Sequence, residues 1–396
     1  KLIFLTSIIT LATLVVVGVV SYTGFRYTET VAFCAKFCHS VMEPEYVTYK
    51  NSPHSRIACV KCHIGAESEW LTRSKFSGVR QLFAVVFDTY SRPLPTPIKA
   101  LRPERSTCEG CHRPEVFHGD KLYVMNRFLP DAGNSHLQTV MVMKIGSGGY
   151  QGRQAHGIHW HVSEEHRVSY ISSPDEKYMY QVSLLDSQGR KEKVYRRREG
   201  QTPSPGTAKK IMDCMDCHNR PTHVFLRADQ ALDEKLASGI IPPHIPYIKR
   251  QGLAAITEDY PSQDVARRAI AEELMDWYRL QYPDLVSGRE EHLASGVRGV
   301  QQAYMENVFP RMNIDWGTYT SFIGHREAES GCFRCHNGNL RDEAGETITQ
   351  DCNACHIILM EDKPARSIEE ILAETEADLP AEHYSPVQPV AAGDSL

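Results

Sequence analysis

The sequence predicts a membrane-anchored chain of helices and loops that folds around covalently attached groups and carries a small antiparallel β insertion. Three observations support this fold class: five copies of Cys-x-x-Cys-His, one long apolar run near the N-terminus, and several short β-prone segments between residues 136 and 200. The 396 residues, 41% of them hydrophobic, suit two or three domains. The net charge of −5 gives no reason to expect nucleic-acid binding.

The first element is the apolar run, residues 2–20, which contains no charged side chain and is long enough to span a bilayer. A cleaved signal peptide is the alternative, but the run is longer than a usual signal core and no A-x-A cleavage site follows it. We therefore expect a transmembrane anchor within residues 1–24. Because the chain starts with Lys1 rather than Met, we also expect a short cytoplasmic end to precede it.

The five motifs read CVKCH, CEGCH, CMDCH, CFRCH and CNACH. This pattern attaches haem c: two thiols bond the two vinyl groups, and the next imidazole binds the iron. Zinc sites and disulfides also use Cys-x-x-Cys pairs, but neither requires a histidine directly after the second cysteine. The predicted attachment residues are Cys59, Cys62, Cys108, Cys111, Cys214, Cys217, Cys332, Cys335, Cys352 and Cys355, and the predicted proximal ligands are His63, His112, His218, His336 and His356.

A sixth site is predicted where Cys34 and Cys38 precede His39 in CAKFCH, with one extra residue between the thiols. The alternative is a local disulfide or a pair of free thiols. All other cysteines lie in the five regular motifs, so we expect six haems in total. Haem c is attached outside the cytoplasm, so we place the protein in a bacterial or archaeal cytoplasmic membrane, with a single span and its haem domain on the periplasmic side.

The order of anchor, CAKFCHSVMEPEY and NSPHSRIACVKCHIG resembles the NapC/NirT-type family of membrane-anchored multihaem quinol dehydrogenases. Met42, Tyr46 and His54 stand where that family has a Met, a Tyr and a His. The chain departs from the pattern in the spacing of its first cysteines and in having two residues between His39 and Met42. Beyond about residue 120 it resembles longer inner-membrane cytochromes of metal-respiring bacteria, which oxidise menaquinol and feed periplasmic carriers.

Between the second and third motifs, apolar and aromatic residues recur at helical spacing and basic residues interleave with them. We expect an amphipathic helix in the headgroup layer of the membrane, although an ordinary helix packed on haems would show the same pattern. A quinol site also needs polar groups that accept two protons. The family resemblance points first to Lys75; the other candidates near the first haem are Glu43, Glu45, Tyr46, Gln81 and Asp88.

Histidines outside the motifs outnumber the distal iron ligands that six haems need. We rank His54, His118, His223 and His325 highest, because several lie close to a motif and each can fold back onto a nearby haem. Met42 is a candidate for the first haem. One of His159 and His161 is expected to bind iron while its neighbour meets a propionate, since in an extended strand both point to one face. His292 and His383 are expected to be surface residues.

The organisation that we expect is an anchor (1–24), a first haem domain (25–135), a β-rich insertion (136–200), a second haem domain with helices (201–366), and a C-terminal helix with a Pro-rich tail (367–396). Ser262 is a predicted N-cap, and residues 367–370 form a predicted capping box. The β insertion either covers haems or docks a partner. The tail is expected to be pinned against another surface, such as a partner subunit.

Taken together, the sequence predicts a quinol dehydrogenase that oxidises menaquinol near the first haem and relays electrons to a periplasmic acceptor. Its expected partners are membrane lipid, the quinone pool, and a periplasmic redox protein or partner subunits, with a homo-oligomer also considered. One alternative is a haem-wire subunit of a larger respiratory complex, with the quinone site on another chain or with electrons flowing into the pool. A terminal reductase with an open iron ranks last, because the histidines can fill every position.

Overall fold

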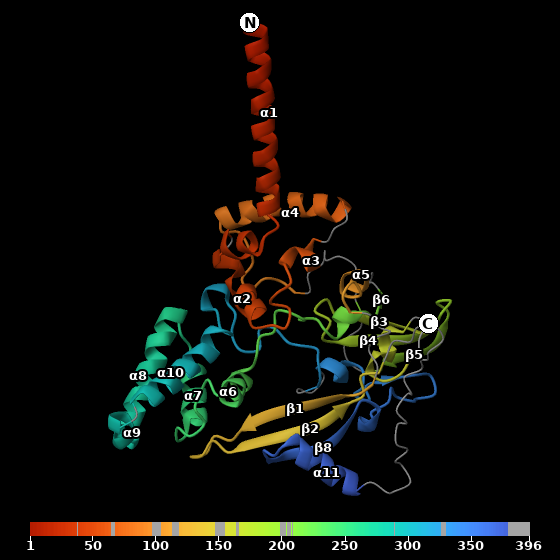
Figure 1. Ribbon diagram of the computed structural model, residues 1–396. Coiled ribbons are helices and arrows are strands. Elements are labelled where there is room, and N and C mark those ends of the chain that lie inside the picture. Colours follow the sequence, from red (N-terminus) through yellow and green to blue (C-terminus); the bar gives the residue numbers. More distant parts are fainter. Residues whose placement is uncertain are drawn as a thin grey trace, which may run out of the picture.

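The computed structural model describes residues 1–37, 39–64, 68–96, 104–112, 119–146, 155–163, 166–198, 203, 207, 209–288, 290–325 and 330–378. Cys38, His118 and the predicted C-terminal tail lie outside these residues, as do the side chains of His39 and Lys75. The architecture mixes helices with two antiparallel sheets (Figure 1). The sheets take up more of the chain than the small β insertion that the sequence predicted.

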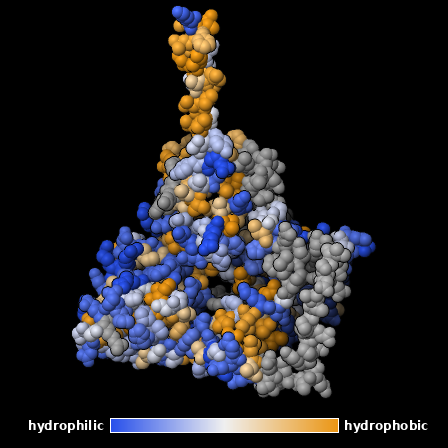
Figure 2. Space-filling view, in the orientation of Figure 1, coloured by the Kyte–Doolittle hydropathy of each residue, from blue (hydrophilic) through white to orange (hydrophobic). Residues whose placement is uncertain are grey.

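Helix α1, Leu2–Tyr27, projects alone from the rest of the molecule as a nearly uniform apolar column (Figures 1 and 2). Its 26 residues extend for about 39 Å, which exceeds the roughly 30 Å hydrocarbon core of a bilayer. None of these residues is buried against the rest of the described structure. An apolar helix that packs on nothing in the protein requires an apolar solvent, and lipid supplies it.

Helix α4, Ser68–Val86, lies across the base of α1 at a steep angle to it (Figure 1). Large apolar side chains are exposed along α4 and just after it: Phe76, Val79, Leu82, Phe83, Val86 and Phe87. On the opposite side, Val85 packs into a small core with Val41 and Tyr319. Beneath α4 lie α2, His39–Lys50, and α3, Cys59–His63.

A helical unit contains most of the apolar core. Its elements are α6 Ala228–Ala237, α7 Ile248–Ile256, α8 Gln263–Gln281, α9 Pro283–Gly288 and α10 Glu290–Met305. The helices bury a continuous apolar stripe that includes Leu232, Ile248, Ile270 and Val300. Ser262 caps α8 as predicted, its hydroxyl accepting a hydrogen bond from the Val265 backbone at 3.3 Å. No haem motif lies within these helices, so side chains alone fill this core.

The first sheet has the strand order β1-β2-β8, with β1 Lys121–Phe128, β2 His136–Met143 and β8 His356–Pro364. The second has the order β6-β3-β4-β5-β7 and comprises β3 His166–Ser172, β4 Met179–Asp186, β5 Lys191–Arg197, β6 Lys210–Ile211 and β7 Leu340–Arg341. Each sheet recruits a strand from the C-terminal haem region. The β-prone segments therefore tie distant parts of the chain together instead of forming a separate insertion.

Two contacts join the parts. Asp233 of α6 accepts a hydrogen bond from the Phe128 backbone at 2.9 Å and pairs with the buried Lys249 at 2.7 Å, which fixes the β1–β2 hairpin to the helical unit. Ser367 and Glu370 form the predicted capping box at the start of α11, Ile368–Asp378, and α11 packs on β8. These contacts join the first sheet to the helical unit on one side and to α11 on the other.

Candidate haem sites

Each regular motif folds as one short helical turn. The second motif forms α3, the third follows α5 (Glu104–Cys108), and the remaining three form 3₁₀ turns at Cys214–Asp216, Gly331–Arg334 and Cys352–Ala354. In three motifs the backbone N–H of the histidine donates to the carbonyl of the first cysteine, at 2.7 to 3.1 Å. One turn brings side chains three positions apart onto one side, as two thiols that bond one porphyrin require.

The motif histidines face histidines from other parts of the chain. Four such pairs have ring centroids 5.8 to 6.4 Å apart: His54 with His112, His63 with His223, His161 with His336, and His325 with His356. Two imidazoles on opposite sides of one iron would have centroids about 6.2 Å apart, from iron–nitrogen bonds of about 2 Å and about 1.1 Å within each ring. The observed spacings therefore fit a haem iron between the rings.

Backbone carbonyls orient several of these rings. The Nδ1 of His161 donates to the Ile158 carbonyl at 2.8 Å, and the Nδ1 of His336 donates to that of Thr349 at 2.7 Å. His54 bonds the Pro221 carbonyl at 3.2 Å, and His223 bonds that of Glu45 at 2.9 Å. A proton held on Nδ1 leaves the lone pair on Nε2, the nitrogen available to a metal.

Burial keeps several of these rings neutral. It lowers the pKa of His63 and His161, and it lowers the pKa of His223 to about 4, with the neighbouring His63 adding to the effect. A neutral imidazole is the form that binds iron, so these pairs are electrostatically prepared for a metal at neutral pH.

His218 has His159 and His112 as its titratable neighbours. Burial lowers its pKa first, and the charge that His159 would carry lowers it further. His159 stands in a 3₁₀ turn, Ile158–Val162, and not in the extended strand that the sequence predicted. The same turn carries His161, whose ring faces His336, while His159 is a neighbour of His218.

The structure differs from the expectation that distal histidines return to the motif nearest in sequence. His223 faces His63 rather than the preceding His218, and His325 faces His356 rather than the nearer His336. His54 faces His112 of the third motif. Met42 lies in α2, three residues after His39.

The predicted quinol-site residues spread over α2 and α4. Glu45 is mostly buried, which raises its pKa, and one of its carboxylate oxygens has no hydrogen-bond partner among the described residues. Tyr46 stacks on Tyr49, and Glu43 is half-buried on the same helix. Gln81 is exposed and donates to Ser77 at 3.3 Å.

Asp88 follows α4 in a left-handed conformation and pairs with Arg92, whose guanidinium lowers the Asp88 pKa. Two residues that the sequence reasoning missed accompany Glu45. Arg220 stacks over the Tyr319 ring at 3.7 Å, and its charge opposes the rise in the Glu45 pKa. No spacing rule links these two residues to Glu45, because only the tertiary fold brings them together.

The membrane helix, the motif turns and the paired histidines define a class of protein, the membrane-anchored multihaem c-type cytochromes. Residues 1–94 match the N-terminal region of the NapC/NirT cytochrome c family. The chain is 38% identical over 348 residues to the cytochrome c-type protein ImcH of Geobacter sulfurreducens, an alignment that covers 86% of this chain and 67% of ImcH. The chain belongs to the NapC/NirT cytochrome c family.

A second relative is the cytochrome c nitrite reductase subunit NrfH of Nitratidesulfovibrio vulgaris, 30% identical over 92 residues, which are 22% of this chain and 55% of NrfH. No solved structure matches the chain. The family assignment means that the protein carries covalently bound haem c, that it acts in electron transport, and that α1 is a transmembrane helix.

Proposed function

We propose that this chain is a hexahaem quinol dehydrogenase, which oxidises menaquinol beside its first haem and passes the electrons to a periplasmic acceptor. The observation that carries the proposal is the set of histidine pairs, which supplies two axial ligands to most of the motifs. Haem iron held by two imidazoles exchanges single electrons and has no open position for a substrate. This ligand set favours electron transfer over a terminal reductase.

The proposed axial pairs follow from the ring spacings. His63 and His223 would hold the second haem, His112 and His54 the third, His336 and His161 the fifth, and His356 and His325 the sixth. His159 is the proposed second ligand beside His218 at the fourth haem. For the first haem, His39 remains the proposed proximal ligand and Met42 a proposed distal ligand. His118 keeps its place among the distal candidates.

Contacts between motifs support two series of adjoining sites, of which the first lies at the membrane end. The Cys34 side chain lies beside that of Cys59, so the first and second motifs adjoin. Cys108 contacts Cys214 in the same way, which joins the third and fourth motifs. Cys217 and Cys355 each lie close enough to Cys332 for its charge to raise their pKa values, which links the fourth, fifth and sixth motifs.

The proposed quinol site lies at the membrane end, between α2 and α4. The exposed apolar side chains of α4 suit the headgroup layer, and α1 would hold that helix at the bilayer surface. Lys75 is the first candidate to bind the quinol oxygen, and Tyr46 and Gln81 are candidate hydrogen-bond partners. Glu43, Glu45 and Asp88 are the candidate proton acceptors, of which Asp88 is the most exposed to water.

Because haem c is attached outside the cytoplasm, we place the haem domain on the periplasmic side of the inner membrane. NrfH is by name a subunit of a nitrite reductase, which supports a periplasmic partner for this chain too. If instead the chain is only a haem wire, the quinone site would lie on another subunit.

The test is anaerobic stopped-flow reduction of the purified full-length protein by a menaquinol analogue, followed at the haem α-band. A quinol-site inhibitor is the control for specificity, and dithionite gives the full amplitude. Fast reduction that the inhibitor blocks supports the proposal. Full reduction by dithionite without reduction by quinol would show that the chain only relays electrons and that a partner subunit holds the quinone site.

A further inference from the structure

A fifth histidine pair lies outside all the haem motifs. His244 precedes α7 and His292 stands in the first turn of α10, and their ring centroids are 5.6 Å apart with an angle of 66° between the ring planes. Both residues are exposed. No cysteine lies near them in the sequence, since the twelve cysteines all belong to the predicted attachment sites. The pair therefore has no means of attaching a haem.

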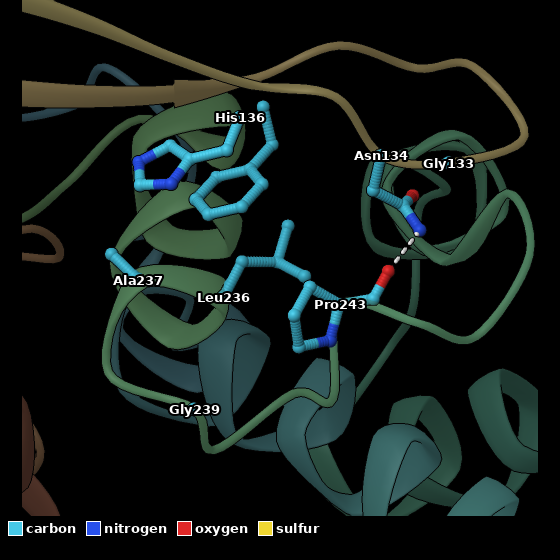
Figure 3. A pocket seen from close by; sticks show the side chains of 8 residues that line it. Gly133, Asn134, His136, Leu236, Ala237, Gly239 and Pro243 are labelled. Atoms are coloured by element: carbon cyan, nitrogen blue, oxygen red, sulfur yellow. Dashed lines mark hydrogen bonds between the residues drawn. The ribbon is translucent and has the colours of Figure 1, made fainter. Parts of the chain in front are cut away.

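The backbone around His244 is held firmly. The side-chain amide of Asn134, which is 1% exposed, donates to the Pro243 carbonyl before His244 at 2.8 Å (Figure 3). It also donates to the Ile245 carbonyl after His244 at 2.7 Å. The Tyr278 hydroxyl donates to the next carbonyl, that of Pro246, at 2.8 Å. Asn134 and Pro243 also line a cavity of about 430 Å³ beneath this loop. The backbone of the loop that carries His244 is thus fixed by side-chain hydrogen bonds from Asn134 and Tyr278.

His292 is fixed by the helix that carries it. Leu293, the next residue, is fully buried, as is Ile245 after His244. The Ile245 side chain packs so closely on Gly296, one turn after His292, that a Cβ added there would lie 2.5 Å from its Cδ1 atom. The two histidines therefore stand on segments that pack directly on one another, so the separation of their backbones is set before any ligand arrives.

The spacing suits chelation of one ion. With metal–nitrogen bonds of about 2 Å, two imidazoles in a tetrahedral site have centroids about 5 Å apart, and in a linear arrangement about 6.2 Å. The observed 5.6 Å lies between these values. Among the described residues there is no group of three or more histidine, cysteine or acidic side chains placed to hold an ion, so water would complete the coordination. Imidazole favours Zn²⁺, Ni²⁺ and Cu²⁺ over Mg²⁺ or Ca²⁺.

We propose that His244 and His292 form a surface site for a divalent transition-metal ion, separate from the haems, that clamps the start of α10 to the loop before α7. The ion would be bound by two neutral imidazoles and by water.

The test is isothermal titration of the tag-free holoprotein with ZnCl₂, repeated with CuCl₂. The proposal predicts one site that is weakened about tenfold or more in both His244→Ala and His292→Ala, because either change removes the chelate. His156→Gln, a change at another exposed histidine, is the matched control and should bind like the unmodified protein. Haem absorbance and the unfolding temperature establish that each variant is folded and loaded.

A second readout is the electron paramagnetic resonance spectrum of bound Cu²⁺, which should show coupling to the nitrogens of two imidazoles. Each single variant should lose this two-imidazole pattern. An edge-to-face contact between two imidazoles would give the same ring spacing without a metal. Absence of binding, or binding that either single substitution leaves intact, would overturn the proposal.

Discussion

The ring centroids of His63 and His223 lie 6.4 Å apart, although His63 belongs to the motif that follows α2 and His223 comes 160 residues later, after strands β1 to β6. The Nδ1 of His223 bonds the Glu45 carbonyl at 2.9 Å, so α2 itself orients the ring. If the second haem lies between these rings, its ligation depends on the docking of the two halves of the chain.

Replacing His223 with Ala should therefore open one iron position. We expect one haem equivalent to change from low-spin to high-spin while the others stay low-spin, because the ligand is lost and not replaced. Electron paramagnetic resonance of the oxidised protein measures this change. His166→Ala is a suitable control, since that ring packs on Trp160 and, among the described residues, faces no motif histidine. An unchanged spectrum in His223→Ala would refute the assignment.

Gly157 positions the turn that carries His159 and His161. Its φ is +67°, and a Cβ there would lie 2.5 Å from the Lys144 carbonyl oxygen, so Gly157→Ala combines backbone strain with a clash. We expect a loss of unfolding free energy of about 1–3 kcal/mol and a partial high-spin signal as His161 moves away from His336. Denaturant unfolding together with the same spin-state measurement checks this.

Gly189→Ala is the matched control for strain alone. Gly189 also has a positive φ, +79°, but its added Cβ would meet nothing within 4 Å. The free energy of unfolding of this variant should fall by about 1 kcal/mol, and every haem should stay low-spin. Equal effects of the two substitutions on the haems would contradict the role given to Gly157.

The α4 helix should lie in the membrane surface with Phe83 toward lipid and Gln81 away from it. In the proposed hexahaem protein every native cysteine is bonded to haem, so a single cysteine introduced at either position can be spin-labelled selectively. In lipid nanodiscs we expect the label at Phe83→Cys to be accessible to oxygen, and the label at Gln81→Cys to an aqueous relaxation agent. Equal aqueous access at both positions would place the helix outside the bilayer.

Lys75→Ala should slow the reduction of the haems by a menaquinol analogue about ten- to a hundredfold, since a group that binds the quinol oxygen and assists its deprotonation is lost. Dithionite should still reduce every haem. Arg80→Ala, which removes another cation from the same helix, is the control. Its haems should be reduced by the quinol analogue at the rate of the unmodified protein. Unchanged quinol kinetics in Lys75→Ala would remove this residue from the site.

Local patterns predicted the elements well, because each depends on short-range physics. The apolar run before Tyr22 forms α1, Ser262 caps α8, and the capping box at Ser367 begins α11. The five regular Cys-x-x-Cys-His motifs form the short helical turns that their spacing requires. The sheets were harder to foresee, because β7 and β8 pair with strands that lie far away in the sequence.

The sequence by itself determined the membrane span, the cysteine motifs and the class of cofactor, because each of these depends on residues that are adjacent or one turn apart. Only the tertiary structure decided which histidine faces which motif: His54, His223 and His325 each lie opposite a motif other than the nearest in sequence. It also exposed the pairing of His244 with His292. A second ligand must reach the opposite side of a metal, and its position is set by how distant segments pack, which no local pattern encodes.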